Sequence, residues 1–472
     1  MEQLDRKLSL VKDEKLRPEK VLMFGEGAFL RAFACYAFDE MNKKDLFNGS
    51  VTIVQPIPEG KIELLKKQQG LFTVLARGLE NGEKVVKTNL ITCVNDYINP
   101  YTEYEKYIKK AQNPELRFVV SNTTEAGISY REGEKLDNKP QVSFPGKVTA
   151  FLYERFTFFE GDKSKGLIFL PCELIDDNGL KLKELVQKYA NEWNLCTEFL
   201  HWIDESCIFA NTLVDRIVAG YPSDEADRIN RQLGYRDELL NTCELFYFWA
   251  IEVSVQIREE LPLDKAGLNV VFSENIAPYR LRKVRLLNGA HTCLAPAALL
   301  YGYKTVGEAV GDESFKKYLE KALYSEIIPT LDINRNVLDG FAKAVIERFS
   351  NPYIKHELLG ITLNCVSKFK VRVLPTILEY QKRFGKIPPV LTFSFAALIA
   401  FYKNGGRFPL TDDERNITFL RDNKLDTIFK NISGAWGVDL EGNSELFASV
   451  EESFNIIKKH GVKPLIERLI ND

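Results

Sequence analysis

Short apolar runs alternate with amphipathic stretches along the first half of the chain. Residues 21 to 24 (VLMF) and 51 to 54 (VTIV) are continuous apolar runs with the length of buried strands. Between them, apolar residues recur at helical spacing from Phe29 to Met41, which predicts a helix with one buried face. A strand, a turn, a helix and a second strand in this order predict the opening unit of a nucleotide-binding α/β fold.

The turn that joins the first strand to this helix carries Gly25 and Gly27. Glycines at these places allow a tight turn and bring the backbone close to a pyrophosphate at the positive end of the helix dipole. Leu30 replaces the third glycine of the usual fingerprint. The prediction of a dinucleotide site therefore rests on the position of the two glycines between a strand and a helix. The predicted cofactor contacts of this unit are Phe24, Gly25, Gly27, Ala28, Phe29 and Arg31, with a surface salt bridge as the alternative for Arg31.

Gln55 follows the second strand, where a carboxylate usually holds the ribose hydroxyls of NAD. No arginine stands there to accept the 2′-phosphate of NADP, so Gln55 is a predicted contact and the residues alone favour NAD only slightly. Two further apolar runs, from residues 117 and 167, end in polar residues. The first predicts that Asn122, Thr123 and Glu125 line the nicotinamide side of the crevice, and an ordinary strand-to-helix cap is the alternative.

From about residue 275 the pattern becomes helical. The helical stretches are 305 to 327, 336 to 349, 353 to 367, 371 to 384, 391 to 403 and 445 to 470. We therefore predict an α/β protein with an N-terminal Rossmann-type dinucleotide-binding domain over 1–270, followed by a mainly α-helical substrate and catalytic domain over 271–472. The longest apolar stretch, near Leu391 to Tyr402, is too short to span a bilayer and indicates a buried helix.

The composition narrows the choice of partner. With 45% hydrophobic and 27% charged residues and a net charge of −3, the chain has the balance of a soluble globular protein and no global attraction to nucleic acid or membrane. The eight cysteines form no C-x2-C pair, which argues against disulfides and against a metal site. We expect a cytoplasmic protein without a signal peptide that acts on a small molecule.

The sharpest chemical signal is KVRLLNGAH at 283 to 291, which sets Lys283, Asn288 and His291 in the arrangement K-x4-N-x2-H. On a regular helix with about 100° per residue, Asn288 lies roughly 140° and His291 roughly 80° around from Lys283. A partly shielded amine can exchange a proton with a substrate oxygen, while an amide and an imidazole hold that oxygen. The alternative is a solvated lysine, an Asn-Gly helix break and a core histidine.

These motifs resemble those of the polyol-specific long-chain dehydrogenases, the mannitol dehydrogenase family. The match lies in Gly25-x-Gly27-x-Phe29-x-Arg31, in VDRI at 214 to 217 and in K-x4-N-x2-H, and it continues through FGEGAFLRAF, SNTTEAGISY, PCELIDDNG, TLVDRIVAGYP, NGAHT and NPYIKHELLGI. The resemblance implies a zinc-independent enzyme that uses NAD, with Lys283 as general acid/base and with Asn288 and His291 polarising the reacting oxygen. Within the family these stretches favour D-altronate and D-tagaturonate, sugar acids of hexuronate breakdown, as substrate and product.

A sugar acid carries a carboxylate, which needs a cation or a cluster of donors in a partly buried pocket. The resemblance implies substrate contacts from Asp215, His356 and Lys368, whereas Lys370 and Arg372 suggest a solvated helix face. His201 and His460 are interpreted as structural.

One position departs from the mannitol branch of the family. Leu174 stands where that branch has an oxyanion-stabilising asparagine, so either another donor takes over or the substrate binds differently. Three alternatives stay open: a fructuronate reductase, a mannitol-type polyol dehydrogenase, and a nucleotide-sensing protein without turnover.

Overall fold

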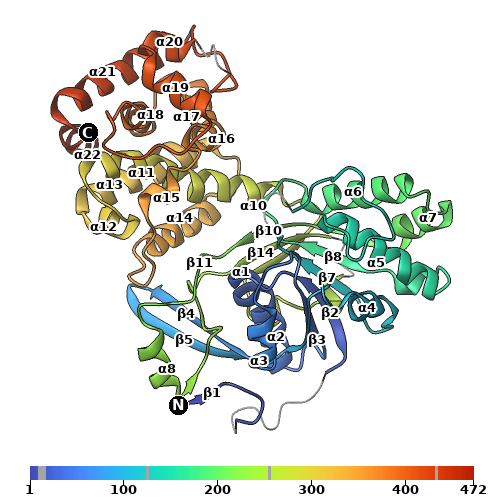
Figure 1. Ribbon diagram of the computed structural model, residues 1–472. Helices are drawn as coiled ribbons and strands as arrows, with labels where there is room; N and C mark the ends of the chain where they lie inside the picture. Colours follow the sequence, from blue (N-terminus) through green and yellow to red (C-terminus); the bar gives the residue numbers. More distant parts are fainter. Residues whose placement is uncertain (9–16, 124–126, 254–256, 431–433, 472) are drawn as a thin grey trace. The chain divides into compact units, whose positions relative to one another are not determined.

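The computed structural model describes residues 1–8, 17–123, 127–253, 257–430 and 434–471. The chain divides into two compact units (Figure 1). Unit 1 comprises Met1–Arg77 and Val85–Ile276, and unit 2 comprises Gly78–Lys84 and Ala277–Asp472. The division after Ile276 falls a few residues beyond the boundary predicted near residue 270, because β15 (Val270–Ser273) still pairs with β14 (Phe248–Glu252) of unit 1.

A six-stranded sheet with only parallel neighbours forms the centre of unit 1. Its strands, in spatial order, are β6 (Val94–Ile98), β3 (Ser50–Val54), β2 (Glu19–Phe24), β7 (Phe118–Ser121), β8 (Ile168–Pro171) and β9 (Ile208–Phe209). The four apolar runs predicted as strands are confirmed within two residues as β2, β3, β7 and β8. The order reverses between β2 and β7, and ligands of open α/β sheets bind beyond the carboxyl ends of strands at such a switch point.

Side chains along these strands alternate between two apolar cores, one on each face of the sheet. In β2, Val21 and Met23 belong to one core, while Leu22 and Phe24 belong to the other. Because both faces are covered, the strand reads as an unbroken apolar run and does not alternate. The first core is shared with α1 (Ala28–Leu30), η2 (Arg31–Cys35) and α2 (Tyr36–Lys43), and the second with α4 (Tyr104–Lys109), α5 (Phe144–Phe158), α6 (Asn178–Glu192) and α7 (Thr197–Ser206).

The other described strands of unit 1 form three smaller sheets. These are β1 (Glu2–Gln3) with β12 (Tyr235–Arg236), β10 (Asn211–Asp215) with β14 and β15, and β11 (Val218–Gly220) with β13 (Asn241–Cys243), β4 (Phe72–Glu80) and β5 (Glu83–Ile91). The remaining helices described in unit 1 are α3 (Ile62–Lys67), η3 (Lys110–Gln112), η4 (Lys163–Lys165), α8 (Ala226–Leu233) and α9 (Ile257–Glu260).

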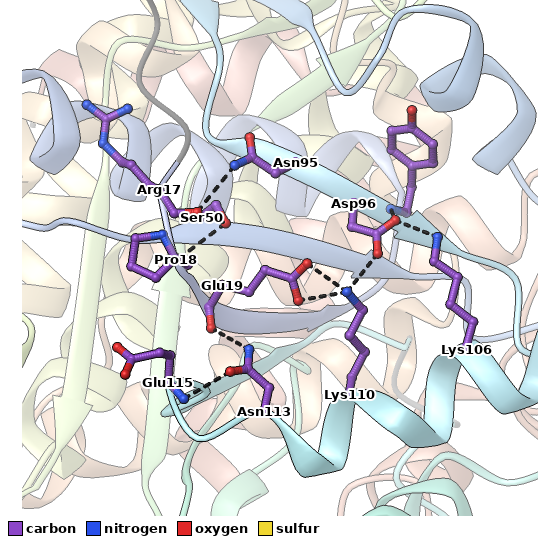
Figure 2. Close-up of polar contacts among 11 residues, drawn as sticks. Arg17, Pro18, Glu19, Ser50, Asn95, Asp96, Lys106, Lys110, Asn113 and Glu115 are labelled. Carbon is purple, nitrogen blue, oxygen red and sulfur yellow. Dashed lines mark hydrogen bonds and ion pairs between the residues drawn. The ribbon is translucent and has the colours of Figure 1, made fainter.

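A polar network joins the strands of the central sheet near their amino ends (Figure 2). Lys110 Nζ lies 2.6 Å from Glu19 Oε1 of β2 and 2.7 Å from Asp96 Oδ2 of β6. Lys106 Nζ lies 2.6 Å from Asp96 Oδ1, and the Asn113 amide donates to the Glu19 carbonyl at 3.0 Å. These contacts tie α4 and η3 to the amino edge of the sheet, which is the edge opposite the glycine turn.

Unit 2 is built from helices. Those after residue 276 are α10 (Ala277–Arg282), η5 (Lys283–Asn288), α11 (Gly289–Tyr301), α12 (Val306–Gly311), α13 (Glu313–Lys321), η6 (Ala322–Ile327), η7 (Ile328–Thr330), α14 (Arg335–Phe349), α15 (Leu358–Ile361), α16 (Cys365–Arg372), α17 (Leu374–Phe384), α18 (Pro389–Tyr402), α19 (Glu414–Asp422), α20 (Leu425–Phe429), α21 (Ser444–His460) and α22 (Lys463–Asn471). The apolar stretch near Leu391 to Tyr402 is confirmed as a buried helix, because α18 packs between α11 and α21. Across the described residues, no helix has the length and apolarity needed to cross a membrane.

The predicted helix over 353 to 367 is wrong in part. Helix starts only at Leu358, stops at Ile361 and resumes at Cys365. Asn364 has a φ of 51°, in the left-handed region that a right-handed helix cannot contain. This break lets α16 begin in a new direction beside α11.

Candidate active site

The glycine turn after β2 has the shape of a phosphate cradle. Gly25 has a φ of 129°, and a Cβ there would lie 3.0 Å from Leu30 Cδ1 and 3.2 Å from the Asn122 carbonyl oxygen, so only glycine fits. A Cβ on Gly27 would meet no described atom within 4 Å. Gly27 is the N-cap residue of α1 and makes no side-chain cap to the first N–H groups of the helix. This open helix start fits a bound pyrophosphate.

Arg31 does not occupy the place that a phosphate contact requires. Its side chain is 1% exposed, and it donates to the backbone carbonyls of Glu26 and Leu239. Burial lowers the pKa of Arg31 to about 10, and the guanidinium also lies over the Phe72 ring at 5.2 Å. Arg31 therefore makes neither a surface salt bridge nor an exposed phosphate contact. It is a buried side chain whose hydrogen bonds hold the glycine turn in place.

The other predicted cofactor contacts around the turn differ in what they can offer. The side chains of Phe24 and Gln55 are buried, so Phe24 can offer only its backbone. Gln55 Nε2 donates to the carbonyls of Ile57 and Pro58, both at 2.9 Å. Ala28 and Phe29 are half-buried at the helix start, and the Phe29 ring stacks on Phe33 with centroids 5.0 Å apart.

The loop after β7 carries Asn122 and Thr123 at the carboxyl edge of the sheet, and both are half-buried. The Asn122 amide donates to the Cys172 carbonyl at 3.0 Å, which joins the ends of β7 and β8. The predicted contact Glu125 lies outside the described residues.

Glu173 is the residue that shapes this loop, a role that the sequence did not reveal. Its carboxylate accepts from Ser121 Oγ at 3.0 Å and from both the backbone N–H and Oγ1 of Thr123 at 2.9 Å. Burial raises the pKa of Glu173. The neighbouring Leu174 is 59% exposed, so the position that would carry the asparagine of the mannitol branch presents an apolar side chain to solvent.

In unit 2, Lys283 and Asn288 are the first and last residues of a π-helical turn, η5, which continues into α11. A π-turn holds more residues per turn than an α-helix, so the rotation of about 100° per residue that the sequence analysis assumed does not hold between these two residues. Both side chains are half-buried. Such turns are often found at functional sites, where they re-aim a side chain.

His291, one turn into the same helical run, is 8% exposed. Its ring stacks on Phe349, with centroids 4.0 Å apart, and meets His356 edge to face at 4.7 Å. Within the described part of the chain, no hydrogen-bond partner reaches the buried Nε2 atom. A buried polar atom left without a partner is costly, so this nitrogen is available to a ligand as a donor or an acceptor.

Several basic side chains act electrostatically on His291. Burial and the neighbouring His356 lower the pKa of His291 well below its usual 6.5. Three cationic side chains lower it as well: Arg348, Arg372 and Lys368. Burial also lowers the pKa of His356, of Lys368 and of Arg372. This clustering of positive charge beside a neutral imidazole is the electrostatic setting that an anionic ligand stabilises.

The structure places the predicted substrate contacts in two settings. His356 and Lys368 belong to the group around His291, and Lys368 Nζ donates to the Ile361 carbonyl at 2.9 Å. Arg372, predicted to lie on a solvated face, is half-buried in the same group, while Lys370 lies against Gly437. Asp215 belongs to unit 1, at the end of β10, and is 4% exposed.

The sequence interpretation overlooked Arg348. This residue lies next to Phe349 at the end of α14 and is 7% exposed. Its only sequence signal is a charged residue among the apolar positions of a helix. The described residues contain no group of three histidine, cysteine or acidic side chains that could hold a metal ion.

Two family models match the chain. Residues 19–265 match the mannitol dehydrogenase Rossmann domain, and residues 275–458 match the mannitol dehydrogenase C-terminal domain. These ranges together cover most of the chain and agree with the α/β fold of unit 1 and the helical fold of unit 2.

Curated relatives and solved structures extend the comparison. An altronate oxidoreductase of Cronobacter sakazakii is 45% identical over 471 residues, covering 96% of this chain and 97% of the relative. One of Shigella flexneri is 50% identical over 400 residues, covering 84% and 83%. A substrate-free D-sorbitol dehydrogenase has a TM-score of 0.82 at 24% identity, with 95% of each chain covered. Pseudomonas fluorescens mannitol 2-dehydrogenase, in a ternary complex with NAD and D-mannitol, has a TM-score of 0.74 at 22% identity, with 100% of each chain covered. At this identity, the two structures show the fold.

Proposed function

This chain belongs to the mannitol dehydrogenase family, and we propose that it is an NAD-dependent oxidoreductase that interconverts D-altronate and D-tagaturonate. The relatives at 45% and 50% identity, both altronate oxidoreductases, support the choice of substrate. The glycine turn of unit 1 holds the dinucleotide, and the helical unit 2 holds the sugar acid. The observation that carries the proposal is the buried, unpartnered Nε2 of His291 within a group of cations.

The residues around η5 divide the chemistry of ketone reduction between them. NADH, when bound, supplies the hydride that goes to the ketone carbon. Lys283 donates its proton to the ketone oxygen in that direction and accepts it back in altronate oxidation. Asn288 and His291 hold the oxygen and stabilise its developing negative charge. Since the pKa of His291 is far below 6.5, a neutral imidazole does this work and leaves the proton transfer to Lys283.

The cations around His291 give the substrate carboxylate its binding site. Lys368, half-buried in α16, and Arg348, buried at the end of α14, come from different helices and approach the same imidazole. A carboxylate between such groups forms charge-assisted hydrogen bonds and offsets the mutual repulsion of the cations. A neutral polyol offers no such compensation, which disfavours the mannitol-type alternative.

Two alternatives differ from the proposal in ways that can be measured. A fructuronate reductase would use the same residues on an isomeric sugar acid. A nucleotide-sensing protein would not need a lysine, an amide and a buried imidazole on one helical run. Leu174, which is exposed, cannot act as the oxyanion donor that the mannitol branch has at this position. We assign the role of that donor to Asn288 and His291.

A cytoplasmic location and a small-molecule partner belong to the same proposal. All eight cysteines are free thiols, and seven of them are buried, as suits a reducing compartment. The formal net charge of −3 gives no support for a nucleic acid or an anionic membrane as partner.

The test is the rate of NADH oxidation by the purified protein with D-tagaturonate, measured beside D-fructuronate and D-fructose and repeated with NADPH. We expect the highest kcat/KM with D-tagaturonate and NADH. A preference for D-fructuronate or D-fructose would move the substrate while keeping the chemistry. Binding of NADH without turnover of any substrate would favour the nucleotide-sensing alternative.

A further inference from the structure

The carboxyl end of β3 lacks the acidic residue that holds the adenosine ribose in NAD-binding sheets of this order. Gln55 stands there, and its amide nitrogen is committed to the Ile57 and Pro58 carbonyls. Its amide oxygen is left as an acceptor. A neutral acceptor can hold one ribose hydroxyl, but it cannot repel the 2′-phosphate of NADP.

Glu26, in the middle of the glycine turn, brings a carboxylate to the same place. A Cβ on Gly60 would lie 2.3 Å from Glu26 Oε1 and 2.5 Å from Gln55 Oε1, so the two oxygens lie close to each other and against the backbone of Gly60. Arg31 fixes the Glu26 peptide by donating to its carbonyl at 3.1 Å. Glu26 is 8% exposed, and its carboxylate accepts hydrogen bonds from the backbone of Glu26 and of Lys61.

We propose that Glu26, together with Gln55 Oε1, binds the 2′- and 3′-hydroxyls of the adenosine ribose and excludes a 2′-phosphate, which makes it the residue that selects NAD over NADP. A vicinal diol carries two O–H donors on neighbouring carbons, and the two oxygens offer two acceptors. The carboxylate charge also repels a phosphate at close range in a poorly solvated site. The glycine turn thus supplies the acid that the strand end lacks. This inference rests on the proposed use of a dinucleotide cofactor, but not on the choice of sugar acid.

The test is a binding titration without substrate, in which quenching of tryptophan fluorescence gives Kd values for NADH and NADPH. Glu26→Gln keeps the shape of the side chain and removes its charge. We expect its ratio of NADPH to NADH affinity to rise by about tenfold or more over that of the wild type, equal to about 1.4 kcal/mol. Glu59→Gln, an exposed acid of the loop after β3, is the matched control and should leave the ratio unchanged.

A second measurement changes the cofactor and uses the same two proteins, the wild type and Glu26→Gln. Wild-type protein should bind NADH that lacks the adenosine 2′-hydroxyl more weakly than NADH, and Glu26→Gln should discriminate less between the two. If Glu26→Gln still bound NADH with an unchanged ratio of NADPH to NADH affinity, or if Glu59→Gln shifted that ratio instead, the role of Glu26 would be overturned. The proposed cofactor would then still stand. Wild-type protein that bound neither nucleotide would contradict the proposed cofactor and, with it, this role.

Discussion

The rings of His291 and His356 meet edge to face in unit 2, with centroids 4.7 Å apart and planes at 74°. The two imidazoles come from separate segments, α11 and the stretch before α15. Burial lowers the pKa of both, and His356 adds to the effect on His291. Each ring therefore stays neutral at neutral pH, and protonating one would make it harder to protonate the other.

This pair predicts a loss of stability in acid. An unfolded histidine binds its proton near pH 6.5, whereas the folded His291 binds it only well below that pH. The unfolded state therefore takes up more protons as the pH falls below 6.5, and folding stability declines. Between pH 7.5 and 5.5, urea unfolding should show His291→Asn losing about 1 kcal/mol less than the wild type. The exposed His460→Asn should match the wild type, and an equal loss in all three proteins would contradict the assigned pKa.

Lys283→Ala should abolish turnover and leave NADH binding nearly intact. A positioned general acid contributes about 10² to 10⁴ in rate, and the cradle for the cofactor lies in a different unit of the fold. The measurement is kcat with D-tagaturonate together with the Kd of NADH. Lys317→Ala, on the exposed side of α13, is the control. A Lys283→Ala protein that kept most of its activity would refute the acid/base role.

The two glycines of the turn after β2 should respond differently to substitution. A Cβ at position 27 would meet no described atom within 4 Å. Gly27→Val should therefore keep the unfolding temperature of the wild type and weaken NADH binding by about tenfold or more, since it crowds the pyrophosphate. Gly25→Ala places a Cβ 3.2 Å from the Asn122 carbonyl oxygen at a φ of 129°. It should cost about 1 to 3 kcal/mol of stability. An unchanged NADH affinity in Gly27→Val would remove the turn from the cofactor site.

We expect the cationic side chains near His291 to affect the binding of substrates that carry a carboxylate. Lys368→Met should raise KM for D-tagaturonate by about tenfold to a hundredfold with a smaller change in kcat, because it removes a charged partner of the carboxylate. Lys370→Met, two residues along α16 and packed on Gly437, should leave KM unchanged. If Lys368→Met lowered kcat and left KM unaltered, the lysine would belong to the proton transfer and not to carboxylate binding.

The sheet of unit 1 was predictable from sequence because its strands are buried on both faces, which leaves unbroken apolar runs such as 21 to 24. The helical stretches of unit 2 were predictable from apolar spacing, but their breaks were not: the stretch 445 to 470 divides at Gly461, whose φ is 77°, into α21 and α22. The helix expected over 353 to 367 failed at Asn364, whose left-handed φ is set by the direction that α16 must take to pack on α11. The spacing of apolar residues gives no information on the direction in which a helix must run.

The candidate site was predictable only in part. The spacing of Lys283, Asn288 and His291 predicts a proton donor beside two oxygen-binding groups, but the π-turn between the first two depends on packing and leaves no mark on apolar spacing. Arg348 was overlooked because it is far from His291 in the sequence. It is next to Phe349, whose ring stacks on His291 in the folded chain. The role of Glu173 was not predictable, because its partners Ser121 and Thr123 lie at the end of β7 and in the loop after it.

The most direct test of the central claim is the product formed from D-tagaturonate and NADH that carries deuterium at C4 of the nicotinamide on the transferred face. Mass spectrometry should find D-altronate with one deuterium at the new carbinol carbon, in a one-to-one ratio to the NADH consumed. Absence of D-altronate, or D-altronate without the label, would contradict direct NAD-linked reduction of this sugar acid.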